Sequence, residues 1–306
     1  MMNSLKESGK IVRIFFIIAM FAFTGCGKIS RPGLLIVAHG SERGGWNGKI
    51  MSLNEAVLRE LRKKNLSAVP VEVCFLESGT DIAAGIDRLI QAGADRILAL
   101  PLFFTYSTHL CEDVPRELGL RYAPGLKQKS VHKGAAHPPY KGKYITLGPP
   151  LGQSPVLKKI ILGHARMLSH NPSTERLVIL CHGSDMFGPH WDAMANDIGN
   201  YVKEKMSLTS WDYAYVGAGQ HFIKNGLPVI RKKFRGTRTL VVGMFMGTSA
   251  LDVAEASLVK AGYGLYTREA ILFSDNVRYC DMSLLPDEDI VRWIADITRE
   301  FYDEHR

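Results

Sequence analysis

Two histidines each lie just beyond an apolar run of strand length. His39 directly follows residues 34–38, and His109 comes shortly after the run at residues 96–104, which is the third of this kind. A neutral imidazole is both a ligand for divalent metals and a base near neutral pH. A facing pair could therefore bind a metal ion and accept protons, and the carboxylates of Glu77 and Glu112 could relay those protons outward.

The segments that must position these side chains alternate between two patterns. Continuous apolar runs of strand length occur at residues 34–38, 71–76, 96–104, 144–147, 177–181, 213–216 and 239–245. Apolar residues recur at helical spacing over residues 49–64, 82–92, 155–169, 192–206 and 287–302. Strands that are apolar throughout, with helices between them, are typical of parallel sheets covered on both faces. The sequence therefore predicts a doubly wound α/β fold.

In such a sheet, ligands bind beyond the carboxyl ends of the strands. They bind at the point where the strand order changes direction, which lies between the first strand and the third. His39 follows the first predicted strand and His109 follows the third. We therefore expect the two imidazoles to face each other across one crevice. A simpler interpretation of the His-Gly-Ser motif needs no chemistry, because Gly40 permits a tight turn and Ser41 can cap the next helix.

The strand followed by His-Gly-Ser occurs twice. Residues 34–41 read LLIVAHGS, and residues 177–184, which lie 143 positions later, read LVILCHGS. We predict two similar half-domains joined near residues 169–174, with the ligand cleft between them. The predicted division is a leader at residues 1–26, a first half at residues 27–170 and a second half at residues 171–306.

Composition excludes several classes of protein. The 306 residues are 46% hydrophobic and 22% charged, which excludes disordered, collagen-like and coiled-coil chains. Five scattered Cys without a CxxC pair exclude a disulfide framework and a zinc knuckle. The net charge of +8 favours anionic partners, but Lys and Arg form no basic run, so we expect no nucleic-acid binding.

The N-terminus has the pattern of a secretory signal. Three cations precede the apolar run at residues 14–25, which is shorter than the roughly 20 residues that span a bilayer. The ending Phe23-Thr24-Gly25-Cys26 resembles a bacterial lipobox, although Phe23 replaces the usual Leu. We expect Cys26 to be lipidated and the protein to be an exported lipoprotein, anchored on the outer side of the cytoplasmic membrane or in the periplasm. An uncleaved signal anchor and a misassigned start codon are the alternatives.

Four segments carry a specific combination of motifs. They read LLIVAHGSERGGWN at residues 34–47, VPVEVCFLE at 69–77, GADRILALPLFFTYSTHLCEDVP at 93–115 and LGPPLGQSP at 147–155. Together they resemble the CbiX-type sirohydrochlorin cobaltochelatases, which belong to the class II tetrapyrrole chelatases. The resemblance covers most of residues 33–260 and implies two chelatase-like half-domains.

The resemblance also implies roles for individual residues. His39 and His109 would hold the incoming divalent metal, cobalt first, with iron or nickel as other possibilities. Glu77 would support these ligands or handle protons. The partner would be sirohydrochlorin or a related anionic tetrapyrrole, as in cobalamin or sirohaem biosynthesis, and no tightly bound organic cofactor is expected. Metal insertion must strip water from the ion and accept two pyrrole protons, for which an imidazole pair with Glu77 or Glu112 as relay is suited.

The second half departs from this pattern. His182 repeats His39, but Leu251 or a neighbour stands where His109 would recur. We therefore predict one competent site per chain and a structural role at a turn for His182, with His190 and His221 as possible substitutes from the loops.

Three other residues leave alternatives open. Cys111 is either a buried small hydrophobe or a third metal ligand near His109. His132 and His137 lie in a segment, residues 125–143, that is either a solvated loop or a metal-delivery loop.

An exported chelatase would need its tetrapyrrole outside the cytoplasm. A second hypothesis is therefore an exported lipoprotein that binds metal or metallated tetrapyrrole for uptake without catalysis. The pair of His39 and His109 favours the enzyme, because a binding protein would need an axial ligand but no facing pair. The oligomeric state is not predicted.

Overall fold

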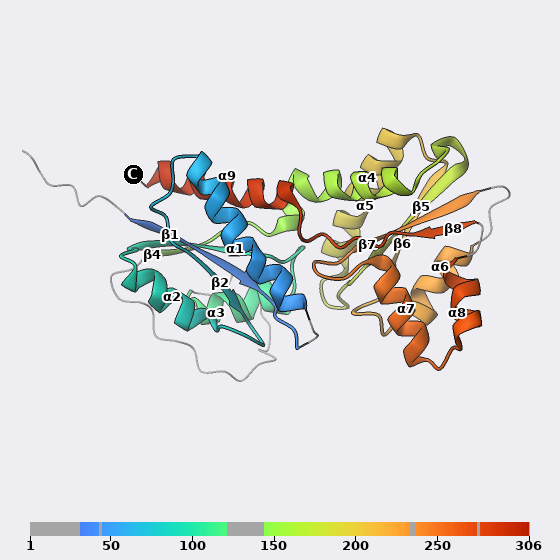
Figure 1. The fold of residues 1–306 in the computed structure, drawn as a ribbon, viewed down its shortest axis with the longest axis horizontal. Helices are drawn as coiled ribbons and strands as arrows, with labels where there is room; N and C mark the ends of the chain where they lie inside the picture. Colours follow the sequence, from blue (N-terminus) through green and yellow to red (C-terminus); the bar gives the residue numbers. More distant parts are fainter. Residues whose placement is uncertain (1–30, 43–44, 121–143, 233–236, 274–275, 306) are drawn as a thin grey trace, which may run out of the picture.

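Two four-stranded parallel sheets lie side by side along the long axis of the molecule (Figure 1). The computed structural model describes residues 31–42, 45–120, 144–232, 237–273 and 276–305. The first sheet has the order β2-β1-β3-β4 and the second the order β6-β5-β7-β8. The strands are β1 (Pro32–Ala38), β2 (Val71–Phe75), β3 (Arg96–Pro101), β4 (Tyr144–Leu147), β5 (Glu175–Cys181), β6 (Ser210–Tyr215), β7 (Arg238–Met244) and β8 (Val277–Tyr279). The predicted α/β class with two similar half-domains is confirmed.

Helices cover both faces of each sheet. In the first half they are α1 (Trp46–Lys63), α2 (Ile82–Gln91) and α3 (Val114–Glu117), with the π-helical turn η1 (His109–Asp113) before α3. In the second half they are α5 (Gly188–Met206), α6 (Leu227–Arg231), α7 (Ala250–Lys260) and α8 (Leu265–Leu272). Short turns η2 (Leu151–Gln153), η3 (Pro172–Thr174) and η4 (Phe222–Gly226) complete the connections, and α4 (Pro155–Leu168) and α9 (Glu288–Glu304) join the two halves.

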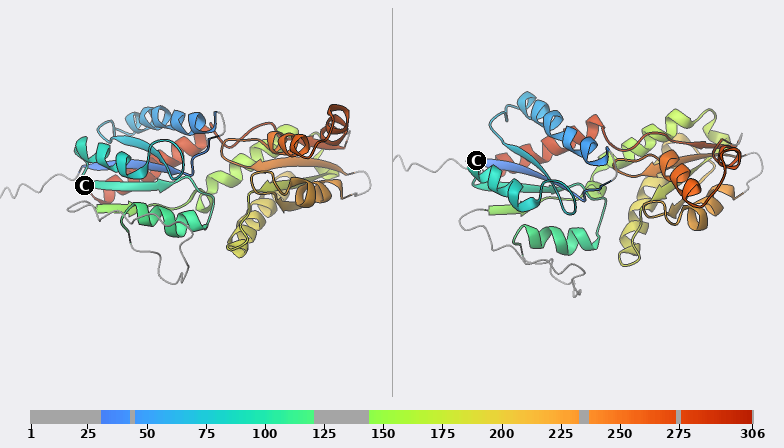
Figure 2. Two further views of the ribbon diagram at one scale, coloured as in Figure 1. Left: turned by 90° about the horizontal axis from the view of Figure 1, so that it is seen from below. Right: turned by 60° about the horizontal axis from the view of Figure 1, so that its bottom comes forward.

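The helices α4 and α9 are exchanged between the halves. α4 follows the first sheet in the chain but packs against α5 and β7 of the second half. α9 follows the second sheet but packs against α1 and β3, and Figures 1 and 2 show it beside α1. An ion pair at 2.7 Å joins Lys64 Nζ to Asp296 Oδ1 of α9. A division of the chain at residue 170 therefore does not follow the packing of these two helices.

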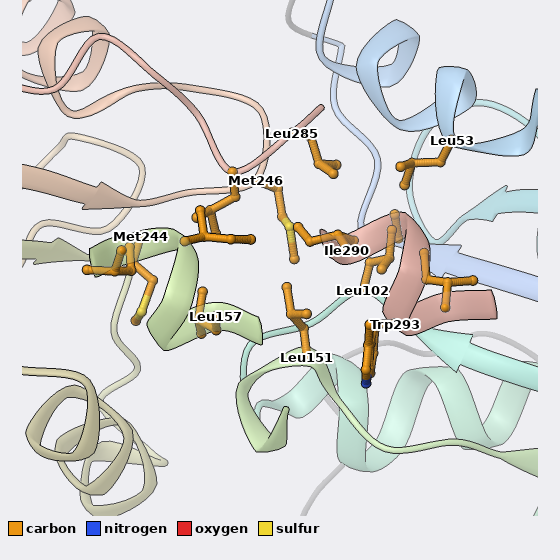
Figure 3. Packing of buried hydrophobic residues seen from close by; sticks show 14 of the residues in the cluster. Leu53, Leu102, Leu151, Leu157, Met244, Met246, Leu285, Ile290 and Trp293 are labelled. Atoms are coloured by element: carbon orange, nitrogen blue, oxygen red, sulfur yellow. The ribbon is translucent and has the colours of Figure 1, made fainter. Parts of the chain in front are cut away.

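One apolar core runs through both halves. Alternate residues of β1 point to opposite faces, so Leu34 and Ile36 join a different cluster from Leu35 and Val37. The cluster of Leu34 and Ile36 continues through the joint between the sheets. Figure 3 shows its central part, with Leu53, Leu102, Leu151, Leu157, Met244, Met246, Leu285, Ile290 and Trp293 labelled. The shared core fixes the two sheets relative to each other, because burying these side chains needs both halves.

Several predictions concern residues outside the described ranges. They include the apolar run at residues 14–25, Cys26, and the segment with His132 and His137. Within the described ranges, no helix combines the length and the apolar character that crossing a membrane requires.

Candidate functional site

A cavity of about 870 Å³ lies where the carboxyl ends of six strands converge. The segments after β1, β2 and β3 line it from the first half, and those after β5, β6 and β7 line it from the second. Its volume is in the range of about 300–1,000 Å³ that small-molecule and cofactor sites occupy. The cavity is therefore the expected ligand site of a doubly wound fold, and each half contributes a wall.

Three potential metal ligands meet at this cavity. Nε2 of His39 lies 3.2 Å from Nε2 of His109, and the rings are at 81° to each other. Oε1 of Glu77 lies 3.5 Å from Nε2 of His39. One ligand atom from each residue lies within 4.8 Å of the other two, and no other group of three His, Cys, Asp or Glu in the described residues meets this criterion.

The turn after β1 positions His39. Gly40 has a φ of +88°, and a Cβ there would come within 2.9 Å of the backbone of Ser78. The turn brings Nδ1 of His39 to 2.8 Å from the carbonyl oxygen of Gly40. The backbone N–H of Glu77 donates to the carbonyl of His39 at 2.9 Å, so both side chains start from one hydrogen-bonded pair. The simpler interpretation of the motif has Ser41 as the cap of the next helix, but α1 begins after Gly45, and no described side chain caps it.

The π-helical turn positions His109. π-helical turns are rare in proteins as a whole, and those that do occur are often found at functional sites. Within this turn, Nδ1 of His109 lies 2.8 Å from Oδ2 of Asp113, and Asp113 is buried. The guanidinium of Arg116 lies 3.2 Å from the other carboxylate oxygen of Asp113. A carboxylate that receives the Nδ1 proton fixes the ring orientation and makes Nε2 a better metal ligand.

These hydrogen bonds determine which ring nitrogen of each histidine carries the lone pair that can bind a metal. A carbonyl oxygen and a carboxylate oxygen can only accept, so Nδ1 of His39 and Nδ1 of His109 both carry a proton. In a neutral imidazole the other nitrogen, Nε2, then has a lone pair. Two lone pairs 3.2 Å apart repel unless a proton or a metal cation binds to them. The site therefore has the chemistry of a cation site.

The protonation state of His109 also favours binding of a metal ion. Burial lowers the pKa of His109 below its ordinary value of 6.5, and the nearby ring of His39 lowers it further. Asp113 and Glu77 oppose this shift. A lowered pKa keeps the imidazole neutral at neutral pH, which is the form that binds metal.

Two other residues of the predicted site lie apart from the ligand group. Glu112 is 3% exposed and does not line the cavity, and within the described part of the chain neither of its carboxylate oxygens has a hydrogen-bond partner. Cys111 packs in the apolar core, where burial raises the pKa of its thiol. Neither contributes a ligand atom to the group of His39, Glu77 and His109.

In the second half, His182 lines the cavity but the predicted substitutes do not. The ring of His190 contacts Tyr106, with centroids 4.5 Å apart, and His221 lies at the start of the η4 turn. Leu251 lies in α7 and packs against the core of the second half.

Asp113 is a residue of the site that the motifs of the sequence did not predict. The spacing His109–Asp113 in the segment HLCED is i, i+4, which brings two side chains together on a helix. That spacing was the available signal. The sequence predicts that Glu77 supports the ligands or handles protons, and its carboxylate also lies close enough to the imidazoles to be a ligand itself.

Comparisons with known proteins show what the chain is similar to. Residues 33–167 match the family model described as CbiX. The chain is 25% identical over 195 residues to a sirohydrochlorin ferrochelatase of Priestia megaterium, covering 63% of this chain and 67% of the relative. It is 36% identical over 89 residues to a sirohydrochlorin cobaltochelatase of Saccharolobus solfataricus, covering 29% and 64%, so the match spans less than two thirds of that relative.

Solved structures share the fold. The sirohydrochlorin chelatase SirB of Bacillus subtilis subspecies spizizenii, determined in complex with cobalt, superposes with a TM-score of 0.61 at 19% identity. The superposition covers 90% of this chain and 96% of that one. The likeness extends to both half-domains and therefore includes the second sheet, which the family model does not reach.

Proposed function

Residues 33–167 belong to the CbiX family, and from this premise we propose that the chain is a chelatase that inserts a divalent metal ion into sirohydrochlorin or a related tetrapyrrole. The observation that carries the proposal is the pair of Nε2 atoms, 3.2 Å apart, at a cavity lined by both halves. The imidazole pair and its neighbouring carboxylate supply only a few ligands to the ion. The remaining coordination positions stay available for the nitrogens of a macrocycle.

The residues can be assigned to the steps of the reaction. His39, His109 and Glu77 replace water molecules of the hydrated ion and present the ion to one face of the macrocycle. As each nitrogen of the macrocycle binds the metal ion, an imidazole or the carboxylate can dissociate from the ion. Each of two released groups then accepts one of the two pyrrole protons, so that a metal dication enters and two protons leave.

Glu77 is the better candidate for the outward relay of protons. Its side chain is 52% exposed, so a proton on its carboxylate can pass directly to water. Glu112 is buried and does not line the cavity. We therefore assign the relay to Glu77 and none of it to Glu112.

The cavity lining bears on how the substrate's carboxylates are held. No Lys or Arg occurs among the described residues of the lining, whereas hydroxyl groups such as those of Ser78, Thr108, Ser184 and Thr248 do. Arg43 follows the lining residue Glu42 but lies outside the described residues. We expect hydroxyl and backbone donors to meet the carboxylates inside the cavity.

Cobalt is the proposed substrate metal, with iron and nickel as alternatives. Imidazole and carboxylate ligands suit all three ions. The names of the two relatives support cobalt and iron, because one is called a cobaltochelatase and the other a ferrochelatase. The ligand set alone does not select among them.

We further propose that the protein is an exported lipoprotein anchored through Cys26. The support is the apolar run ending in a lipobox-like segment. The tetrapyrrole would then have to be available outside the cytoplasm. If it is available there only in metallated form, the protein would bind it for uptake without catalysis.

The test of the chelatase proposal is direct. The purified chain is incubated with metal-free sirohydrochlorin and Co²⁺, and the absorbance of the metallated product is followed against a reaction without protein. We expect insertion well above the spontaneous rate. Binding of the tetrapyrrole without accelerated insertion of cobalt, iron or nickel would reject the enzyme and leave the binding protein.

A further inference from the structure

The second half presents one imidazole to the same cavity. His182 lines the cavity from the turn after β5, as His39 does from the turn after β1. We infer that His182 is an axial ligand, which coordinates the metal of the metallated tetrapyrrole from the macrocycle face opposite to His39 and His109. This inference rests on the proposed function, because it needs a tetrapyrrole in the cleft.

The backbone of the second turn repeats that of the first. Nδ1 of His182 lies 3.0 Å from the carbonyl oxygen of Gly183, and Gly183 has a φ of +81°. The carbonyl of His182 accepts a hydrogen bond at 2.9 Å from Gly217, the counterpart of the bond from Glu77 to His39. Because Nδ1 must donate to the carbonyl, Nε2 of the neutral ring has the lone pair. The second turn thus prepares its imidazole for a metal as the first turn does.

In the first half, Glu77 and His109 complete the metal site around His39. Around His182, residues without a metal-binding side chain stand in their places. Gly217 stands where Glu77 stands in the first half, and Leu251 lies in α7 of the segment that corresponds to His109. A single imidazole is a poor site for a hydrated ion, which several ligands must hold together. In a metallated macrocycle, by contrast, four positions are already filled by ring nitrogens. One additional imidazole then matches the one axial position on the remaining face.

The arrangement of the cavity places this imidazole on the second wall. The segments after β1 and β3 provide His39 and His109, whereas the segment after β5 provides His182 from the other half. A flat macrocycle bound between the halves has one face toward each. The metal that enters from the first half therefore meets His182 on the far face.

A buried aromatic residue supports His182. Trp191 of α5 is 4% exposed, lines the cavity, and lies with its ring centroid 6.3 Å from that of His182. Trp191 also contacts Phe104 of the first half at 6.0 Å, so it joins the two walls. Its buried indole N–H has no hydrogen-bond partner among the residues that the structure describes. An unpaired buried donor at the wall of a cavity is the kind of group that a bound ligand or its water can satisfy.

The test uses preformed cobalt(II) sirohydrochlorin, so that it does not depend on metal insertion. Cobalt(II) in a macrocycle has an unpaired electron directed along its axis, and one axial nitrogen splits its electron paramagnetic resonance lines into triplets. The full chain with both His39→Ala and His109→Ala is used, because it removes the first-half imidazoles as alternative ligands. We expect this variant to show the triplets and the additional change His182→Ala to abolish them.

A matched control and a second measurement keep the outcome clear. His190→Ala removes a nearby imidazole of α5 that does not line the cavity, and it should leave the triplets in place. In the chain with His39 and His109 intact, His182→Ala should weaken binding of cobalt(II) sirohydrochlorin by about tenfold or more, a loss typical of disturbed metal coordination. His182→Gln, which keeps a polar side chain, should weaken binding similarly, and circular dichroism checks the folding of each variant.

Two outcomes would overturn the inference. They are triplets that persist without His182, and a double variant that shows no triplets although it binds the macrocycle. Failure of the proposed function would look different. The wild-type chain would then not accelerate cobalt insertion into metal-free sirohydrochlorin, whatever the resonance of the preformed complex shows.

Discussion

Nε2 of His39 lies 3.2 Å from Nε2 of His109, although the hydrogen bonds at both Nδ1 atoms leave each Nε2 with a lone pair when the rings are neutral. Glu77 adds a negative charge beside them. Such a group is electrostatically favourable only when it shares a cation, either a proton or a metal ion.

Removing one imidazole should separate insertion from binding. In His109→Ala the metal loses one of its ligands and the reaction loses a candidate base, so we expect the insertion rate to fall by about 100-fold or more. Affinity for the metal-free tetrapyrrole should change far less, because most of the contact comes from the cavity walls. Absorbance measures the rate and fluorescence quenching the affinity, on one preparation.

The matched control for this variant is His221→Ala, since His221 is exposed and does not line the cavity. It should preserve both quantities. Equal losses of rate in the two variants would contradict the assignment of the site.

Asp113 should act on the metal through His109. In Asp113→Asn the carboxylate that accepts the Nδ1 proton becomes an amide, which can instead donate and favour the wrong tautomer of His109. We expect metal affinity to fall by about 10- to 100-fold, as is typical for the partners of metal-ligating histidines. Calorimetric titration with Co²⁺ measures this affinity without tetrapyrrole. Glu117→Gln changes a neighbouring carboxylate that pairs with Arg116, and its affinity should stay near that of the wild type.

Metal binding should weaken in acid below the ordinary range of histidine. Burial lowers the pKa of His109 from 6.5, so the ring stays neutral and available as the pH falls through 6.5. Protonation at lower pH then removes the Nε2 lone pair, and metal affinity declines reversibly. Titrations with Co²⁺ between neutral pH and pH 5 should show a midpoint below 6.5, and His109→Ala should lack this phase. A midpoint above 6.5 would mean that the carboxylates, rather than burial, dominate the environment of His109.

The sequence predicted the position of the imidazole pair because two general rules sufficed for it. Continuous apolar runs located the strands, and the topology of a doubly wound sheet placed the ends of the first and third strands together. The sequence predicted the ends of individual strands less accurately. The run at residues 96–104 was expected to be strand throughout, whereas β3 ends at Pro101, which has no N–H to continue a ladder.

Other features could not be derived from local patterns. The apolar face of α9 predicts a buried helix, but it does not say that the helix crosses to the first sheet. Nothing in HLCED separates a π-turn from an α-helix. The start of α7, by contrast, has a local signal, because Ser249 and Asp252 form a capping box.

The lipoprotein proposal has its own test. Cys26→Ser removes the thiol that lipidation requires, so we expect the protein to leave the membrane fraction or to accumulate as an unprocessed precursor. Cell fractionation with immunoblotting measures both outcomes. Unchanged processing and membrane attachment in this variant would rule out lipidation at Cys26.

The helix exchange predicts that the first half depends on the last helix of the chain. Ile294 of α9 is fully buried in the core that runs through both halves, and truncating a buried Ile to Ala costs about 2–5 kcal/mol. Ile294→Ala should therefore lower the free energy of unfolding by an amount in that range, measured by denaturant titration. Tyr266→Ala is the control, because Tyr266 is 86% exposed and such surface changes stay within about 0.5 kcal/mol. Since the core is shared, both sheets should unfold in one transition in wild type and variant. Two separate transitions in the wild type would show that the halves are stable independently of the exchanged helices.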